Sequence, residues 1–154
     1  MNNNTKYSSL VSSFFNKIKD YMFVELDEKT ASEIVISYIP SACNQFQSCN
    51  QNLEDRDNIM EEFNFELTPS NYEMLVNYMV IEYIDSNYLR TTQALRSRLS
   101  SSDFKSLNLQ QQLSKVMELR SMLKSENDQL AINKSYKDSK LFDIVANRNK
   151  VGGH

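Results

Sequence analysis

The sequence predicts an all-α protein, a small bundle of about four to five helices with an extended C-terminal arm. Glycine and proline are scarce, since the 154 residues include only Gly152, Gly153, Pro40 and Pro69, whereas β-sandwiches and barrels use many of both in tight turns. Hydrophobic residues make up 40% and charged residues 24%, as in an ordinary folded domain. We therefore expect one helical domain over residues 1–132 and the arm over residues 133–154.

The first helix is expected over residues 8–22, where apolar residues recur on one helical face. A second helical stretch follows the pair Asp27–Glu28, with Thr30 or Ser32 as possible caps. Pro40 falls inside this stretch, and because proline lacks a backbone donor and clashes with the preceding turn, we expect a kink or break near Tyr38–Ile39. The apolar positions of the two stretches are Leu10, Phe14, Ile18, Tyr21 or Met22, then Ile34, Ile36, Tyr38, Ile39, Ala42, Cys43 and Phe46.

The third stretch has the clearest helix start. Thr68 is a good N-terminal cap, and Pro69 suits the first helical position, where its missing N–H has no cost. The run that follows, residues 72–84, is apolar around much of its circumference. Such a helix is buried on several sides, so we predict that it is the core helix.

Two further helices are expected. Residues 88–99 place Leu89, Leu95 and Leu99 inward and three arginines outward. A last amphipathic helix begins after the polar loop at 100–103 and ends near Leu130. Its heptad-like span is short, which favours pairing in a helical hairpin over a long coiled coil. The outward arginines are Arg90, Arg96 and Arg98, and the last helix is marked by Leu109, Leu113, Val116 or Met117, Leu119 or Arg120, and Leu123.

The chemistry-bearing residues argue against an enzyme and predict no cofactor and no metal. The one histidine is His154, the last residue of the sequence. Phosphate-binding loops require glycine, and the sequence has none before position 152. Cys43 and Cys49 would lie about 9 Å apart on a helix, too far for a disulfide, so we expect free thiols. The acidic residues around Arg56 are a candidate divalent-cation site, but a self-paired charged face is the favoured interpretation. These acidic residues are Glu54, Asp55, Asp57, Glu61 and Glu62.

Charge is unevenly distributed along the chain. Residues 1–132 carry 12 basic and 18 acidic residues, a net −6, whereas residues 133–154 carry 5 basic and 2 acidic residues, a net +3. An acidic body does not favour general binding to nucleic-acid phosphates. No apolar run approaches the roughly 20 residues of a membrane-spanning helix, and no signal peptide is evident, so we expect no membrane partner and assembly in the cytoplasm.

Between Ala42 and about Leu123, the order of residues resembles the small neck proteins of tailed bacteriophages, the head–tail connectors or adaptors. The resemblance is carried by an Asp-Arg-Asp segment before the core helix and a Ser-x-x-Asp-Phe-Lys segment after it. Its parts are Ala42-Cys43, Phe46, Cys49, Leu53 to Asp57, Leu67-Thr68, Glu73 to Leu75, Met79 to Tyr83, Leu95, Leu99-Ser100, Asp103 to Lys105, Asn108, Leu113 and Glu118 to Arg120.

The resemblance implies a helical subunit, about twelve copies of which form a ring under the portal vertex of the virion. Such a ring extends the DNA channel without reading the DNA sequence, and it gives the tail or a stopper protein a place to attach. Family members commonly reach the portal protein with an extended arm. The chain departs from this pattern at Pro40 and in the polar segment after Asn133.

Eight residues are predicted to contact partners. In the arm, Leu141, Phe142, Ile144 and Val145 are too few to form a core, and docking on a neighbouring molecule is favoured over a fraying tail. Asp55, Arg56 and Asp57 would form either inter-subunit ion pairs or a local network at a helix end. Phe104 would anchor a neighbouring subunit or, as is more common, pack on its own core.

Three rival functions remain open. The first is a small helical binding module, such as a phage regulator that acts on a host protein. The second is a nucleic-acid binder that uses Arg90, Arg96, Arg98 and Lys105. The third, an enzyme that binds Mg²⁺ through the acidic cluster, is the least favoured.

Overall fold

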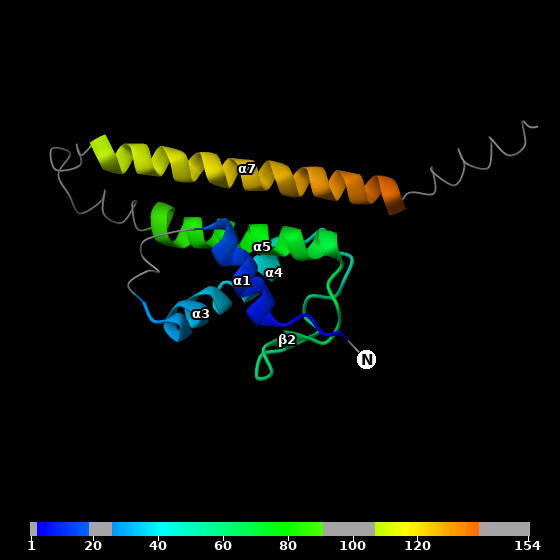
Figure 1. The fold of residues 1–154 in the computed structure, drawn as a ribbon. Helices are drawn as coiled ribbons and strands as arrows, with labels where there is room; N and C mark the ends of the chain where they lie inside the picture. The colour runs from blue at the N-terminus through cyan, green and yellow to red at the C-terminus, as the bar shows by residue number, and fades with distance from the viewer. Residues whose placement is uncertain (1–2, 19–25, 91–106, 139–154) are drawn as a thin grey trace, which may run out of the picture.

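The computed structural model describes residues 3–18, 26–90 and 107–138, and these segments are mostly helical, as predicted. In chain order they form α1 (Tyr7–Lys17), α3 (Glu28–Ile36), α4 (Ile39–Gln45), β1 (Arg56–Asp57), β2 (Glu62–Phe63), α5 (Pro69–Ile84), the π-helical η1 (Asp85–Arg90) and α7 (Leu107–Asp138). The small β-hairpin is the one departure from the helical pattern among these elements. Figure 1 shows α5 at the centre, with α7 along one side and α1, α3 and α4 on the other.

The predicted core helix is confirmed in α5. Most of its residues are buried around the whole circumference, from Asn71 to Ile84, because α1 and α4 cover one side and α7 the other. Aromatic side chains fill the space between α1 and α5. The rings of Phe14 and Tyr83 meet edge to face at 5.7 Å, and Tyr38 stacks on Phe14 at 6.3 Å.

The helix ends follow local chemistry. The Thr68 hydroxyl accepts a hydrogen bond from the Asn71 backbone N–H at 3.3 Å, and Pro69 occupies the first turn, as predicted. The break expected near Tyr38–Ile39 is confirmed, since a turn at 37–38 separates α3 from α4. Pro40 lies in the first turn of α4. The cap of α3 is Asp27, whose carboxylate accepts from Thr30 N–H at 2.8 Å, so neither Thr30 nor Ser32 is the cap.

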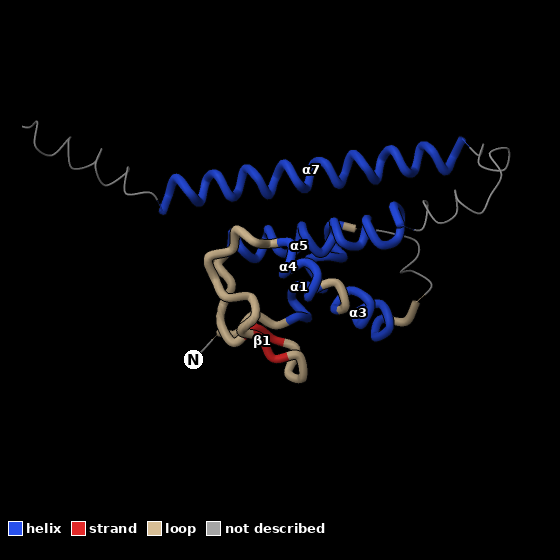
Figure 2. The backbone as a smooth tube through the Cα atoms, turned by 180° about the vertical axis from the view of Figure 1, so that it is seen from behind, coloured by secondary structure: helices blue, strands red, loops and turns tan. Residues whose placement is uncertain are grey.

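Two helix ends differ from the prediction. Helix α1 ends at Lys17, with Ile18 as its C-terminal cap, and residues 19–22 of the expected helix lie outside the described segments. Helix α7 runs eight residues beyond the expected end near Leu130, so residues 133–138 are helical and not extended. At 32 residues α7 is about 48 Å long, twice the length of α5, and it projects beyond α5 at both ends (Figure 2).

The predicted helix over 88–99 is only partly within the described residues. Its first residues belong to η1, which continues α5 as one wide helical turn. Residues 91–99 lie outside the described segments. Among the helices that the structure describes, none is both long and apolar enough to cross a membrane.

Candidate interaction surfaces

The β-hairpin is tied to the N-terminal segment by backbone hydrogen bonds. Arg56 pairs with Phe63 and Asp57 with Glu62 in antiparallel register. Thr5 lies alongside β2, since its carbonyl accepts from Phe63 N–H at 2.8 Å and its hydroxyl accepts from Leu67 N–H. The hairpin is therefore fixed to the start of α1 although it contains only two residue pairs.

The predicted partner residues Asp55, Arg56 and Asp57 hold this hairpin together. The Arg56 guanidinium donates to the Leu53 carbonyl at 2.7 Å, and the Asp55 carboxylate accepts from the Asn64 side-chain amide at 2.7 Å. The contacts of these residues are local, as the interpretation of a local network predicts, but the network belongs to a hairpin and not to a helix end. The inter-subunit ion pairs therefore stay a prediction.

The loop between β1 and β2 presents two apolar side chains to solvent. We call residues 58–61 the hairpin tip. Ile59 is 93% exposed and Met60 is 67% exposed. The Asp57 carboxylate accepts from the backbone N–H groups of both, at 2.8 and 3.0 Å, which fixes the turn. Glu61 closes the loop at φ 54°, an uncommon backbone conformation for a residue other than glycine.

Two contacts from α1 hold the hairpin tip in place. The Tyr7 hydroxyl donates to the Asn58 side-chain oxygen at 3.0 Å, and the Tyr7 backbone N–H donates to the Glu61 carbonyl at 2.8 Å. Tyr7 itself is buried, and burial raises the pKa of its hydroxyl. Ile59 and Met60 are thus displayed on an ordered loop, not on a loose one. The sequence offered a signal for this tip, two apolar residues between turn-forming and acidic ones, but hydrophobic periodicity does not detect it.

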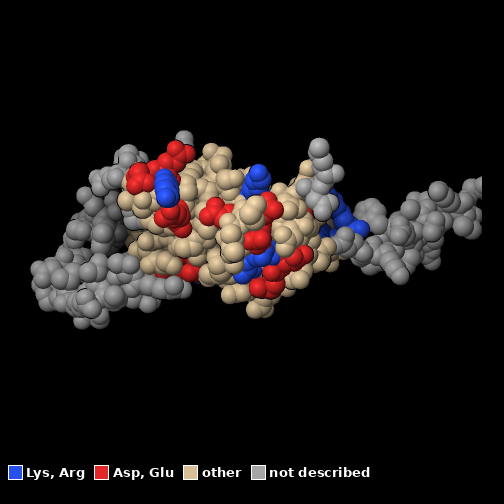
Figure 3. Space-filling model, turned by 90° about the horizontal axis from the view of Figure 1, so that it is seen from below, with Lys and Arg blue, Asp and Glu red and all other residues tan. Residues whose placement is uncertain are grey.

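The surface around the hairpin tip is acidic. Glu54, Asp55 and Glu61 are exposed, and Asp57 and Glu62 are partly exposed. Figure 3 looks at this side of the molecule and shows acidic side chains, some with basic ones beside them, among uncharged surface. Within the described segments, no three His, Cys, Asp or Glu side chains gather as the ligands of a metal ion would.

A hollow of about 220 Å³ lies under the C-terminal half of α7, away from the hairpin tip. The segment after α4 forms one wall, α5 the floor and α7 the other wall. Lys134 stands in this wall with its ammonium group 2.5 Å from the Asn50 and 2.6 Å from the Asn71 side-chain oxygen. The residues that line the hollow are Phe46, Ser48, Asn50, Met74, Ala131, Lys134 and Ser135.

Helix α7 packs on α5 through polar pairs spaced by one heptad, which we call the polar ladder. Arg120, Asn127 and Lys134 are seven residues apart and pair with Asp85, Asn77 and Asn71. These partners, two on α5 and Asp85 at the start of η1, run in the opposite direction, so α5 and α7 are antiparallel. The helical pairing predicted for the last helix is thus confirmed, with α5 as its partner. Between the pairs, the buried Leu123 and the half-buried Leu130 supply apolar contacts, and the half-buried Val116 adds one before Arg120.

The first pair of the polar ladder is a two-pronged ion pair. Arg120 donates from Nε and Nη2 to the two oxygens of Asp85, at 2.6 and 3.1 Å. Both side chains are about one-fifth exposed. The hydrogen bonds that Arg120 donates to Asp85 raise the pKa of Arg120, so this guanidinium is charged throughout the usual pH range.

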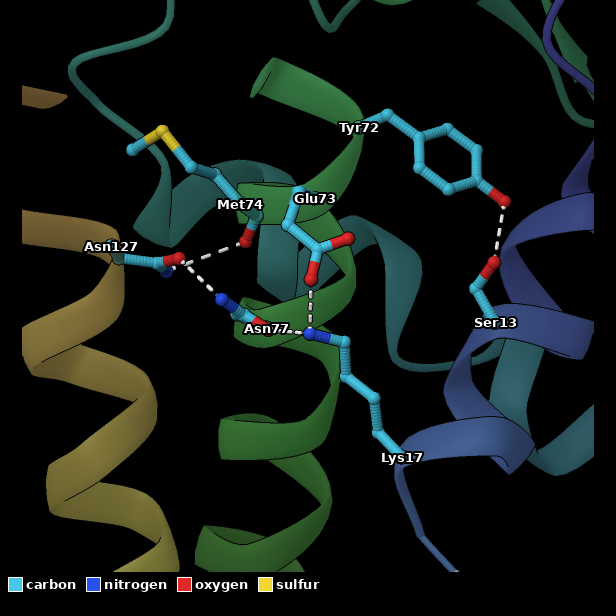
Figure 4. Close-up of polar contacts among 7 residues, drawn as sticks. All are labelled: Ser13, Lys17, Tyr72, Glu73, Met74, Asn77 and Asn127. Carbon is cyan, nitrogen blue, oxygen red and sulfur yellow. Dashed lines mark hydrogen bonds and ion pairs between the residues drawn. The ribbon is translucent and has the colours of Figure 1, made fainter. Parts of the chain in front are cut away.

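The middle pair of the polar ladder is buried and connects three helices (Figure 4). Asn77 donates to Asn127 at 2.9 Å, and Asn127 donates to the Met74 carbonyl at 3.3 Å. From α1, the Lys17 ammonium donates to the Asn77 side-chain oxygen at 2.6 Å and forms an ion pair with Glu73. Asn77 is fully buried and Asn127 is 2% exposed, so the Asn77 side-chain N–H depends on Asn127 for its acceptor.

The outward face of α7 carries scattered apolar side chains. Met117, Met122, Ile132 and Tyr136 are between 40% and 63% exposed. They alternate with polar residues, so this face offers less contiguous apolar surface than the hairpin tip.

The two cysteines are free, as predicted. Burial raises the pKa of the Cys43 thiol to about 11 and also raises the pKa of the Cys49 thiol. Both are therefore protonated and weakly nucleophilic at neutral pH.

The other predicted contact residues lie outside the described segments. These are Phe104 and the arm residues Leu141, Phe142, Ile144 and Val145. The same holds for Arg96, Arg98 and Lys105 of the nucleic-acid hypothesis, while only the backbone of Arg90 is described. Comparisons of the chain with protein-family models, with curated proteins and with solved structures find no match.

Proposed function

We propose that this protein is a non-catalytic assembly subunit, a ring-forming head–tail connector of a tailed-phage neck. The observation that carries the proposal is the hairpin tip, where Ile59 and Met60 stand almost free of the rest of the chain on an ordered loop. Exposing two large apolar side chains on an ordered loop is unfavourable in water, and contact with another protein would remove that cost.

The remaining surfaces support the same proposal. The hollow and the hairpin tip share no residue and form two separate surfaces of one chain, an arrangement suited to repeated subunit contacts. The net charge of −6 over residues 1–132 would let DNA pass through a channel without being held by its phosphates. The arm residues at 141–145 would then reach the portal protein, and the opposite rim would receive the tail or a stopper protein.

Native mass spectrometry and negative-stain electron microscopy of the full chain test the proposal. We expect concentration-dependent growth from monomer to a closed ring with a central channel, on the order of twelve copies. A chain that stays monomeric at all concentrations contradicts it.

Truncation separates the arm from the ring. Removing residues 139–154 leaves α7 whole, whereas a cut after Ile132 would also remove Lys134 and its bonds to α5. The shorter chain is expected to keep its helical content and its ring but to lose binding to the portal protein. Unchanged portal binding would contradict the role of the arm.

The second candidate is a monomeric binding module that acts on a host protein. The exposed face of α7, with Met117 and Met122, favours it because a helix face of this kind can enter a groove on a partner. A stable monomer would select this candidate over the connector.

A further inference from the structure

We infer that the hairpin tip of one copy inserts into the hollow of a second copy, so that the chain self-associates head to tail. This inference rests on the proposed function and deepens it by naming the surfaces that meet. The occupant is a second copy of this chain because the two halves of the contact, an exposed apolar projection and a partly apolar recess, are both present on every molecule.

Size agrees with this assignment. The hollow measures about 220 Å³, less than the roughly 300–1,000 Å³ of sites for drug-sized molecules, so it suits one or two side chains. Phe46, Met74 and Ala131 supply apolar lining. Ile59 and Met60 project together from the four-residue hairpin tip. They are the most exposed large hydrophobic side chains among the residues that the structure describes.

Charge agrees as well. Among the described residues, the Lys134 ammonium contacts the neutral side-chain oxygens of Asn50 and Asn71, and no carboxylate lies within ion-pair distance. The hairpin tip brings the carboxylates of Asp57 and Glu61 beside its apolar side chains. Insertion would therefore place negative charge next to an uncompensated cation. The same carboxylates would be repelled by the anionic surface of a membrane, which disfavours a lipid as the occupant.

The chain cannot satisfy this contact by itself. The hairpin tip points away from α7 (Figures 1 and 2), whereas the hollow is lined in part by α7, and the hollow contains no residue of the tip. A contact between two different surfaces leaves one of each free on every dimer, so association continues until the subunits close into a ring or form a filament.

Complementary variants of the full chain test the inference. Ile59→Asp disables the tip and Ser135→Trp obstructs the hollow, and both positions are exposed, so folding should be retained as measured by circular dichroism. Each variant alone is expected to associate at least about tenfold more weakly than the wild type. An equimolar mixture should form a dimer and stop there, because only one intact tip can meet one intact hollow. Met122→Asp on the outward face of α7 is the matched control and should assemble like the wild type.

The outcomes distinguish this inference from the proposed function. If the Ile59→Asp variant assembles like the wild type, or if the mixture of variants gives no dimer, the head-to-tail contact is overturned. The ring proposal is then unaffected. Open filaments that Ile59→Asp abolishes support the contact and contradict the closed ring. A wild-type chain that stays monomeric overturns both.

Discussion

Replacing Asn127 tests whether the buried amide pair holds α7 on α5. Asn127→Ala removes the acceptor of Asn77 Nδ2 and the donor to the Met74 carbonyl, both in the buried interface. The Met74 carbonyl keeps its place in the helix ladder of α5, but the Asn77 amide is left without its acceptor. Because Asn77 is fully buried, water cannot replace the lost partner without opening the interface.

The magnitude follows from these losses. A stranded buried donor costs about 1–3 kcal/mol, and the second lost hydrogen bond about 0.5–1.5 kcal/mol. Alanine regains up to about 0.7 kcal/mol through its higher helix propensity. We therefore expect the free energy of unfolding to fall by about 2–3 kcal/mol. For a chain of this length, the melting temperature should fall by about 4–12 °C.

A double substitution makes the expectation sharper. Asn77→Leu and Asn127→Leu each strand the amide of the other residue, so each should cost about 2 kcal/mol. Together they replace both partners by apolar side chains of similar size, while Lys17 keeps its ion pair with Glu73. The double variant should cost about 1 kcal/mol, a coupling energy of about 3 kcal/mol.

Urea denaturation followed by circular dichroism measures these energies. Asn133→Ala, the same chemical change at an exposed position of α7, is the control and should alter stability by less than about 0.5 kcal/mol. If the double variant loses as much as the two single variants combined, the amides do not depend on each other, and the reasoning from the polar ladder is refuted.

Three further outcomes are expected. Thr68→Ala removes the cap of α5 and should lower the free energy of unfolding by about 1 kcal/mol in urea titrations, whereas Thr68→Ser should retain most of it. A double-mutant cycle of Asp85→Ala and Arg120→Ala should give a coupling energy of about 1–3 kcal/mol; additive effects would show that this bidentate pair is as weak as an exposed one. The raised pKa values of Cys43 and Cys49 mean that the folded chain keeps protons which the unfolded chain releases near pH 9, so this contribution to stability is complete below pH 9 and falls above it, for Cys43 until the pH reaches about 11. Urea midpoints between pH 8 and 11 should fall less steeply in Cys43→Ala than in the wild type, and an equal slope would contradict this origin.

Composition and local pattern sufficed for the helical class and for several element ends. The scarcity of glycine and proline predicts the helical class. The apolar run of α5, its cap at Thr68 and the break near Pro40 depend only on neighbouring residues, and the structure confirms all three. Asp27 was missed as a cap because three capping residue types stand close together, and only the backbone conformation selects among them.

The polar ladder and the hairpin tip could be found only in the folded chain. The apolar pattern of the sequence marks the last helix only as far as about Leu130, and it assigns no partners to Arg120, Asn127 and Lys134. The fold instead places them against Asp85, Asn77 and Asn71, residues 35 to 63 positions away, where polar pairs fix the antiparallel register and extend the helix to Asp138.

The exposure of Ile59 also depends on the tertiary structure, since a hydrophobic residue is buried only if another segment covers it. Local sequence thus determined which segments become helices and where two of them begin. The tertiary structure decided which polar residues are buried and which apolar ones are not, because burial depends on contacts between segments distant in the chain.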